Sequence, residues 1–382
     1  MAAFKAVGTT TTTITASVSA AAMRSVTGRR LLPLALLMKQ QHTHRSFSTT
    51  PSSTSLATAT QSSYNYDYSQ PITKSLPIYD FFSQPKPKPS FNFAYGAAGI
   101  AKRGRQTQSN ECYQSIQVGE DAYFYRSDAL GVADGVGGWI GTAGANAALY
   151  SRKLMHHAFL EMERFDNIED PLFCMHEKAN PVEVLQHSYE ACLREAKQEG
   201  IVGSSTACLA VLRGDELRVA NLGDCGISVI RNNGYVFRSE EQQHSFNYPY
   251  QLGTQSRDRP NHAQTFNVNV ERNDIIIMGS DGLFDNLFDK EILTIVQSHV
   301  AAHTLPGSDG RSPRLLNFNP QALADALASE AQAVSENQRH LDSPFQRKAM
   351  NEGLYYQGGK ADDISVLVAI VRDSEDSPDR RL

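Results

Sequence analysis

The stretch Leu130 to Trp139, LGVADGVGGW, determines how the rest of the chain is interpreted. Its small apolar residues predict a buried strand that ends at Asp134, and the glycines that follow predict a turn. A carboxylate at this position is presented at the end of the strand. An Asp-Gly pair alone most often marks only a turn, so a functional interpretation needs support from elsewhere in the sequence.

A second predicted strand, AYFYR, precedes this stretch and follows Asp121. If Ser127 and Asp128 form a two-residue hairpin loop, residue 126 pairs with 129 and residue 121 pairs with 134. Asp121 and Asp134 then lie opposite each other, with Cβ atoms about 5 Å apart. Because like charges at that distance destabilise a strand pair, this register predicts a bound cation.

The same pattern returns further along the chain. The apolar run of residues 275–278 leads to Asp281, and Asp362 stands just before the last predicted strand, residues 364–371. In an antiparallel sheet the end of one strand lies beside the start of its neighbour. We therefore expect four carboxylates to converge, those of Asp121, Asp134, Asp281 and Asp362.

The residue types in this set favour particular metals. The four carboxylates are accompanied by no Cys or His, and an all-oxygen set suits Mg²⁺ or Mn²⁺ and not zinc. Two such ions about 3.5 to 4 Å apart can share a bridging hydroxide as nucleophile and neutralise phosphoryl oxygens. The pattern therefore predicts a two-metal hydrolytic site.

Other segments supply the expected framework. A first strand begins in residues 91–95, and residues 204–239 hold four short strands that predict an antiparallel meander. A polar segment follows at residues 240–263 and predicts a long loop or flap. We expect helices in residues 144–162, after the N-cap Asn180 followed by Pro181, at Asp289 as a cap, and from Asn319.

Composition limits the classes of function. The chain has 382 residues and a formal net charge of −5, so nothing in its charge favours a nucleic-acid partner. The five cysteines lack a CxxC pair and predict reduced core thiols, not disulfides or a zinc site. No apolar run approaches the roughly 20 residues of a membrane-spanning helix, so we expect no membrane insertion.

The N-terminal region differs from the rest. No Asp or Glu precedes Asp67, while Arg, Lys, Ser and Thr are frequent, which is typical of a mitochondrial transit peptide in residues 1–48. A plastid address and a leader without an address are the alternatives. Residues 49–90 predict a disordered linker rich in Ser, Thr and Pro. We expect a folded domain in residues 91–373 and a polar tail in residues 374–382.

Five motifs occur in the following order between residues 91 and 372: GEDAYF, VADGVGGW, NLGDCG, GSDGLFDNL and KADDISVLVA. In that order and spacing they resemble the metal-dependent protein serine/threonine phosphatases of type 2C, the PPM family. With its leader and HSFNYPYQL, the chain looks most like the mitochondrial subfamily called protein phosphatase 2C homolog 7. The resemblance implies an α+β fold, a four-layer α-β-β-α sandwich with two central antiparallel sheets and the metals between them at one end.

The resemblance also implies roles for single residues. Asp134 matches the aspartate that bridges both metal ions, and Gly135 matches a glycine whose carbonyl binds one of them. Asp281 and Asp362 match the remaining carboxylate ligands. Asp121 matches the aspartate of a Glu-Asp pair that binds metal-bound water. Asp134 and Asp281 would thus act in catalysis through that water.

Three further acidic residues have weaker matches. Glu120 is the glutamate of the Glu-Asp pair, and Asp224 matches a position linked to a weaker third metal. Asp363 stands where the family often has Asn, so we expect it to support the ligands. These three are possible members of the metal site.

The chain departs from the family pattern at two places. Val136 stands where many relatives have a histidine proposed to protonate the leaving oxygen, so another group must supply that proton. Ser115 and Ile116 stand where the family has a phosphate-binding arginine. The candidate substitutes are Lys102, Arg103 and Arg105, and the alternative is that these form an ordinary solvated basic face.

We therefore expect a monomeric Mg²⁺- or Mn²⁺-dependent phosphatase acting on phosphoserine and phosphothreonine in mitochondrial matrix proteins. The subfamily resemblance adds enzymes of ubiquinone biosynthesis as possible partners. The missing histidine leaves open a catalytically weak pseudo-phosphatase that binds phosphoproteins. A two-metal nuclease is a third reading, disfavoured by the acidic chain.

Overall fold

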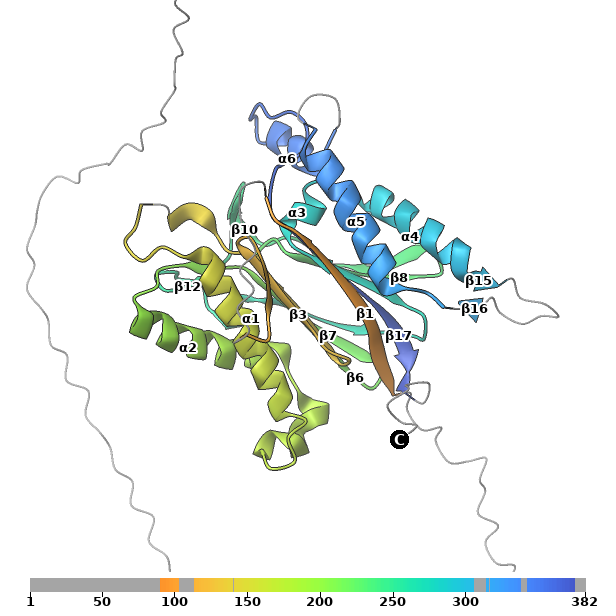
Figure 1. The fold of residues 1–382 in the computed structure, drawn as a ribbon, viewed down its shortest axis with the longest axis horizontal. Helices are drawn as coiled ribbons and strands as arrows, with labels where there is room; N and C mark the ends of the chain where they lie inside the picture. Colours follow the sequence, from red (N-terminus) through yellow and green to blue (C-terminus); the bar gives the residue numbers. More distant parts are fainter. Residues whose placement is uncertain are drawn as a thin grey trace, which may run out of the picture. The chain divides into compact units, whose positions relative to one another are not determined.

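The computed structural model describes residues 90–102, 113–139, 141–305, 314–315, 317–337 and 342–374 (Figure 1). The predicted transit peptide, the linker up to residue 89 and the tail from residue 375 lie outside these ranges, as do Arg103 and Arg105. Their predictions therefore stay predictions. Among the described residues, none of the helices is both long and apolar enough to cross a membrane.

The first of two central antiparallel sheets contains the predicted hairpin. Its strands are β2 (Ile116–Val118), β3 (Asp121–Tyr125), β4 (Ala129–Ala133), β6 (Ala207–Arg213), β7 (Glu216–Leu222) and β13 (Gln264–Asn269), in the order β13-β7-β6-β4-β3-β2. Ala122 pairs with Ala133 and Tyr125 with Leu130. This confirms the predicted register and its two-residue loop.

The second sheet brings together segments that are far apart in sequence. It contains β1 (Phe91–Ile100), β8 (Gly226–Arg231), β9 (Gly234–Arg238), β14 (Ile275–Gly279) and β17 (Ile364–Asp373), in the order β1-β17-β14-β8-β9. The predicted meander is wrong, because β7 and β8 belong to different sheets. The chain crosses between the sheets at Gly223, whose φ of +110° favours glycine.

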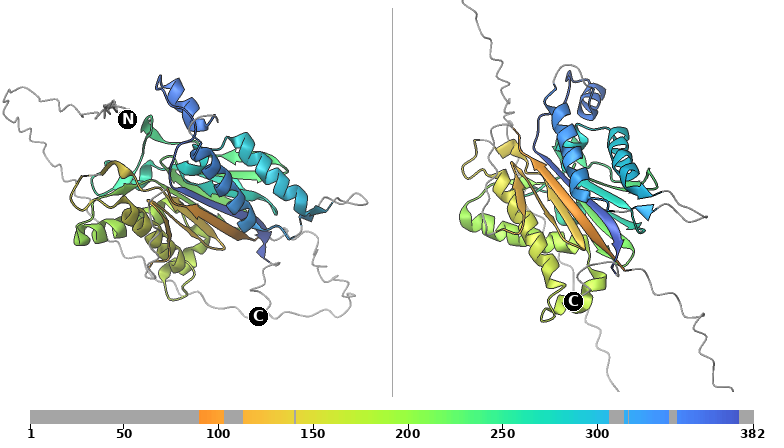
Figure 2. Two further views of the ribbon diagram at one scale, coloured as in Figure 1. Left: turned by 45° about the horizontal axis from the view of Figure 1, so that its top comes forward. Right: turned by 45° about the vertical axis from the view of Figure 1, so that its right-hand side comes forward.

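Helices cover the outer face of each sheet, as Figures 1 and 2 show. The first sheet is covered by α1 (Ala147–Arg164) and α2 (Pro181–Glu199), and the second by α4 (Asp289–His303) and α5 (Pro320–Ser335). Three buried clusters fill the spaces: α1 and α2 against the first sheet, the two sheets against each other, and α4 and α5 against the second sheet. The predicted four-layer α-β-β-α sandwich is confirmed.

Two of the predicted helix starts are correct. The side chain of Asn180 accepts a hydrogen bond from the N–H of Val182 at the start of α2, and Asn319 caps α5 in the same way. The prediction for Asp289 is wrong, because it is the first residue of α4 and not its cap. There, Glu291 satisfies the N–H of Phe288 at 2.9 Å, so the third residue of the helix does the capping.

The predicted flap at residues 240–263 contains short regular elements. They are β10 (Gln243–Ser245), β11 (Tyr248–Pro249), β12 (Leu252–Gly253), which pairs with β5 (Ser204–Ser205), and the 3₁₀ helix η3 (Pro260–His262). The remaining elements are η1 (Gly137–Trp139), η2 (Pro171–Lys178), α3 (Asp281–Phe284), α6 (Pro344–Asn351), β15 (Thr304–Leu305) and β16 (Arg314–Leu315).

The described cysteines carry free thiols, as predicted. Cys192, Cys208 and Cys225 are buried core residues, whereas Cys174 is exposed. The prediction of a core position is therefore wrong for Cys174, because it lies in η2 on the surface. Cys112 lies outside the described residues.

Candidate metal centre

The β3–β4 hairpin places two of the predicted carboxylates side by side. Asp121 is the first residue of β3, and Asp134 directly follows β4. The N–H of Gly135 donates to the carbonyl of Glu120 at 3.1 Å, so the pairing of the two strands continues past Asp134. The side chain of Thr206 accepts from the N–H of Asp134 at 3.0 Å and fixes its backbone.

The second sheet supplies the other two. Asp281 is the first residue of α3, two residues after the end of β14, and Asp362 stands two residues before β17. Because β14 and β17 are antiparallel neighbours, the end of one lies beside the start of the other. The N–H of Ser280 donates to the carbonyl of Ser365 at 3.1 Å, which extends this pairing to the sheet edge.

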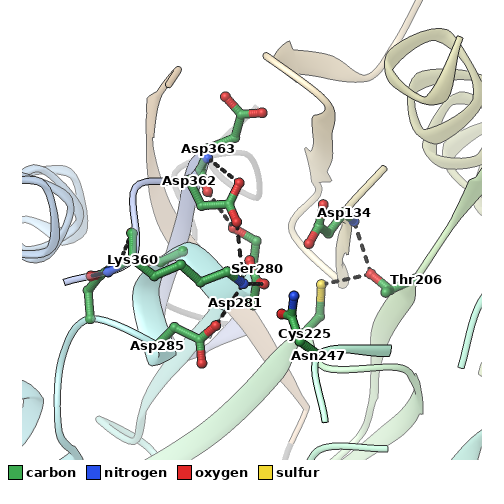
Figure 3. A network of polar contacts seen from close by, with 12 residues as sticks. Asp134, Thr206, Cys225, Asn247, Ser280, Asp281, Asp285, Lys360, Asp362 and Asp363 are labelled. Carbon is green, nitrogen blue, oxygen red and sulfur yellow. Dashed lines mark hydrogen bonds and ion pairs between the residues drawn. The ribbon is translucent and has the colours of Figure 1, made fainter. Parts of the chain in front are cut away.

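Electrostatics shows that the two pairs face each other across the sheets. Burial raises the pKa of Asp134 well above its usual value, and the charges of Asp281, Asp121 and Asp362 raise it further. Burial likewise raises the pKa of Asp121, with contributions from Asp363, Asp281 and Asp362. Each of the four predicted carboxylates therefore lies within electrostatic range of others in the set. Figure 3 shows Asp281 and Asp362 on one side of the site and Asp134 on the other.

Asp224 joins the same cluster from the crossing between the sheets. Its side chain is buried, and burial followed by the charge of Asp281 raises its pKa well above the usual value. Asp224 therefore lies within electrostatic range of Asp281. Its role as a ligand remains a proposal.

Unpaired oxygens test whether this cluster fits a metal. In the described part of the chain, Asp121 Oδ2, Asp224 Oδ1 and Asp281 Oδ1 are buried without a hydrogen-bond partner. Leaving buried carboxylate oxygens unpaired is costly unless a cation binds them. Oxygen donors of this kind fit Mg²⁺ or Mn²⁺.

Asp363, one of the weaker candidates, fixes the backbone around the site. One oxygen of Asp363 accepts from the N–H of Glu120 at 2.8 Å, and the other accepts from the N–H of Lys102 at 2.7 Å. Asp363 therefore ties the segment after β1 to the turn before β3. A Cβ at Gly135 would lie 2.5 Å from the carbonyl oxygen of Glu120, so only glycine fits there.

Sequence reasoning missed three residues of this site. Lys360 Nζ donates to Asp281 and, at 2.8 Å, to Asp285 Oδ2, and it lies 3.3 Å from Asp362 Oδ2. Lys348 Nζ donates to Asp285 Oδ1 at 2.8 Å. One signal was available for Asp285, which stands four residues after Asp281 and thus on the same helix face. No sequence spacing connects Lys348 to Asp281 or Asp285.

Burial raises the pKa values of the carboxylates in this site, and the charges of the two lysines lower them. Burial raises the pKa of Asp281 to about 6, although the charge of Lys360 counteracts part of this increase. For Asp285 burial also disfavours ionisation, but the charges of Lys360 and Lys348 outweigh it and lower the pKa. Asp285 is thus held as a carboxylate by two ammonium groups.

Of the three basic candidates for phosphate binding, Lys102 is the one that the structure describes. Its Nζ lies 3.8 Å from Asp362 Oδ1, and its side chain is 42% exposed. It borders a pocket of about 410 Å³ together with Asp362, Gln332 and Glu336. This location is compatible with a contact to a substrate phosphate.

A second acidic group lies at the other end of the hairpin. Ligand atoms of Asp128, Asp166 and His176 lie within 4.8 Å of one another. However, Arg126 pairs with both aspartates, and Arg213 Nη1 donates to Asp128 at 2.9 Å. The arginines already compensate these carboxylates, so this group is an ion-pair network.

Known proteins are similar to this chain in sequence and in fold. Residues 129–372 match the family described as "Stage II sporulation protein E (SpoIIE)". The chain is 36% identical over 307 residues to "Protein phosphatase PTC7 homolog" of Danio rerio, which covers 75% of this chain and 90% of that protein. It is 36% identical over 288 residues to "Probable protein phosphatase 2C 55" of Arabidopsis thaliana, which covers 73% of this chain.

The coverage of these relatives differs. The chain spans 55% and 59% of the length of two Arabidopsis thaliana relatives. A solved structure, "X-ray structure of the photosystem II phosphatase PBCP", is 29% identical and superposes with a TM-score of 0.55, covering 73% of this chain and 98% of that one. Together with the motifs and the sandwich, these matches show that the chain belongs to the type 2C (PPM) family of protein phosphatases and is PTC7-like within it.

Proposed function

We propose that the chain is a divalent-metal-dependent phosphatase that hydrolyses phosphoserine and phosphothreonine in proteins. One observation carries this proposal: buried carboxylates from two separate sheets converge and leave three oxygens unpaired. Such a cluster is destabilising without cations. Membership of the type 2C family supplies the reaction class.

The residues of the site would have two roles, to hold the metal ions and to position a water molecule. Asp134 and the carbonyl of Gly135, from the first sheet, would hold the ions together with Asp281 and Asp362 from the second. Asp121 would position a water molecule beside them. When bound, divalent ions acidify water and offset the negative charge of phosphoryl oxygens. Both Mg²⁺ and Mn²⁺ suit this donor set.

Lys102 would orient the substrate. Its ammonium group stands at the rim of the pocket beside Asp362, where it can contact a phosphate oxygen. Because Asp363 fixes the backbone of Lys102, this side chain extends from a rigid point. We expect Lys102→Ala to raise KM for a phosphopeptide more than it lowers kcat, whereas Lys102→Arg should restore KM.

The activity test uses the full chain with a phosphothreonine peptide in Mn²⁺, in Mg²⁺ and in EDTA. We expect phosphate release with either metal and none in EDTA. Full activity in EDTA would refute the proposal. Val136 favours the second candidate, a pseudo-phosphatase, because valine has no proton to give. Peptide binding without turnover under all metal conditions would support that candidate instead.

A mitochondrial location extends this proposal. It is supported by the acid-free, Arg- and Ser-rich leader. Phosphoproteins of the mitochondrial matrix, among them enzymes of ubiquinone biosynthesis, are the proposed substrates. Fusion of residues 1–60 to a fluorescent reporter tests the address, and a diffuse cytosolic signal would contradict it.

A further inference from the structure

We propose that Lys360 is a built-in cation of the metal centre, which occupies a position among Asp281, Asp285 and Asp362 that another divalent ion would otherwise take. This inference rests on the proposed metal-dependent function and deepens it, because it limits how many ions the site can hold. It concerns a lysine to which the sequence patterns gave no role.

The ammonium group lies where a cation would bind. Lys360 Nζ contacts one oxygen from each of three carboxylates, and its side chain is only 13% exposed. Figure 3 shows the side chain of Lys360 extending from its backbone into the carboxylate cluster, with Asp134 on the opposite side. Three oxygens around one positive centre are the arrangement that a metal ion would also use.

The two carboxylate oxygens of Asp281 have different surroundings. Its Oδ2 accepts from Lys360, while its Oδ1 is buried without a hydrogen-bond partner. The same carboxylate can therefore bind a divalent ion through Oδ1 and keep its contact with Lys360 through Oδ2. Binding of that ion does not require Lys360 to leave.

Asp285 gives the strongest reason for Lys360 to remain. One of its oxygens accepts from Lys360 and the other accepts from Lys348, both at 2.8 Å. Because an ammonium group lies against each oxygen, a divalent ion at Asp285 would be repelled by both lysines unless one of them were displaced. In a buried setting, breaking such a pair leaves an uncompensated charge and is strongly unfavourable.

The backbone of Lys360 is fixed as well. Its N–H donates to the side-chain oxygen of Asn286 at 2.9 Å, and the side-chain amide of Asn286 donates to its carbonyl at 2.9 Å. Asn286 is fully buried in the turn after α3. The ring of Phe345 lies 5.0 Å from the ammonium group, a favourable cation–π distance. Lys360 thus behaves as a fixed part of the site.

The first experiment counts bound metal. The full chain is titrated with Mn²⁺, with heat measured by calorimetry and free Mn²⁺ by electron paramagnetic resonance. We expect Lys360→Met to bind one Mn²⁺ per chain more than wild type, and Lys360→Arg, which keeps the charge, to bind the wild-type number. An unchanged number and affinity in Lys360→Met would overturn the inference.

A matched control separates a local from a general effect of removing a buried lysine. Lys153 on α1 is 3% exposed and pairs with Glu195 and Glu199, which belong to α2 and not to the carboxylate cluster. Lys153→Met should bind the wild-type number of ions. If wild type itself binds no Mn²⁺, the proposed function fails. If it binds Mn²⁺ and Lys360→Met gains none, only the present inference fails.

A second experiment needs no variant and stays decisive if Lys360→Met does not fold. Wild-type protein is acetylated briefly in Mn²⁺ and in EDTA, and labelling is read by mass spectrometry. We expect Lys360 to stay unlabelled in both conditions, while the exposed Lys102 reacts in EDTA. Labelling of Lys360 that appears only with Mn²⁺ would show that the metal displaces it, which would overturn the inference.

Discussion

Asp134 is the residue at which function and stability conflict most directly. Burial and four neighbouring carboxylates disfavour its charge and raise its pKa. We predict that Asp134→Asn abolishes metal binding and lowers kcat/KM by about 10³-fold, the order seen when a main electrostatic group is removed. The same change should stabilise the metal-free protein by about 1 kcal/mol or more, because one buried like charge disappears.

Asp128→Asn, at the opposite end of the same hairpin, is the matched control. Asp128 accepts from Arg213, whose side chain is fully buried, so its loss should cost about 1 to 3 kcal/mol of stability. Metal binding should be unchanged. Urea unfolding in EDTA measures both effects, and equal signs for the two variants would contradict the assignment of the centre.

The carboxylate pKa values predict an unusual dependence of stability on pH. Burial raises the pKa of Asp281 to about 6 and raises those of Asp121, Asp134 and Asp224 as well. A carboxylate whose pKa is higher in the folded protein stabilises it below the unfolded value, near 4, and loses that contribution as pH rises through the folded value.

We therefore expect the melting temperature in EDTA to fall between pH 5.5 and pH 7.5. With saturating Mn²⁺ the trend should reverse, since protons compete with the metal for the same oxygens. Thermal melts at both pH values, with and without Mn²⁺, provide the test. A metal-free protein that gains stability over this range would show that other groups dominate.

The sequence predicted the four carboxylates because each stands at a strand end. That position can be derived from a local pattern, and the hairpin register adds a geometric reason for Asp121 and Asp134. Lys360 and Lys348 could not be predicted this way. Their contacts depend on how α3, α6 and the segment before β17 pack, and no spacing in the sequence encodes that packing.

At the scale of elements, the turn after β4 depends on Gly135. We predict that Gly135→Ala weakens Mn²⁺ binding and costs about 1 to 3 kcal/mol, because its Cβ would meet the backbone oxygens of Glu120 and Ala147. Gly138→Ala in the same segment is the control, since a Cβ there meets nothing within 4 Å. Mn²⁺ titration and urea unfolding compare the two, and equal losses would contradict this account.

Elements with strong local signals were predicted well. The Asn-Pro pairs at the starts of α2 and α5 specify both a cap and the first helical residue. The assignment of strands to sheets was not predictable, because β7 and β8 show the same alternation whether they share a sheet or not. Only the turn at Gly223 separates them, and a Leu-Gly-Asp turn also fits a hairpin.

At the scale of the molecule, the fold explains why the centre lies where it does. Residues between the two sheets form a continuous apolar core. At one end this core gives way to carboxylates from β3 and β4 on one side and from the ends of β14 and β17 on the other. Like charges on facing layers repel, so the carboxylates destabilise this end of the metal-free sandwich.

Metal binding should therefore strengthen the contact between the layers. We expect Mn²⁺ at 100 times its dissociation constant to add about 2.7 kcal/mol to the free energy of unfolding for each ion bound. Hydrogen exchange should slow in residues 130–136 of the first sheet and in residues 277–283 of the second, because the ions would bind both. Residues 181–199 of α2 belong to the outer layer, so they should show only the global change. Protection confined to one sheet would mean that the ions do not bridge the layers, and the ligand set would then have to be reassigned to that sheet alone.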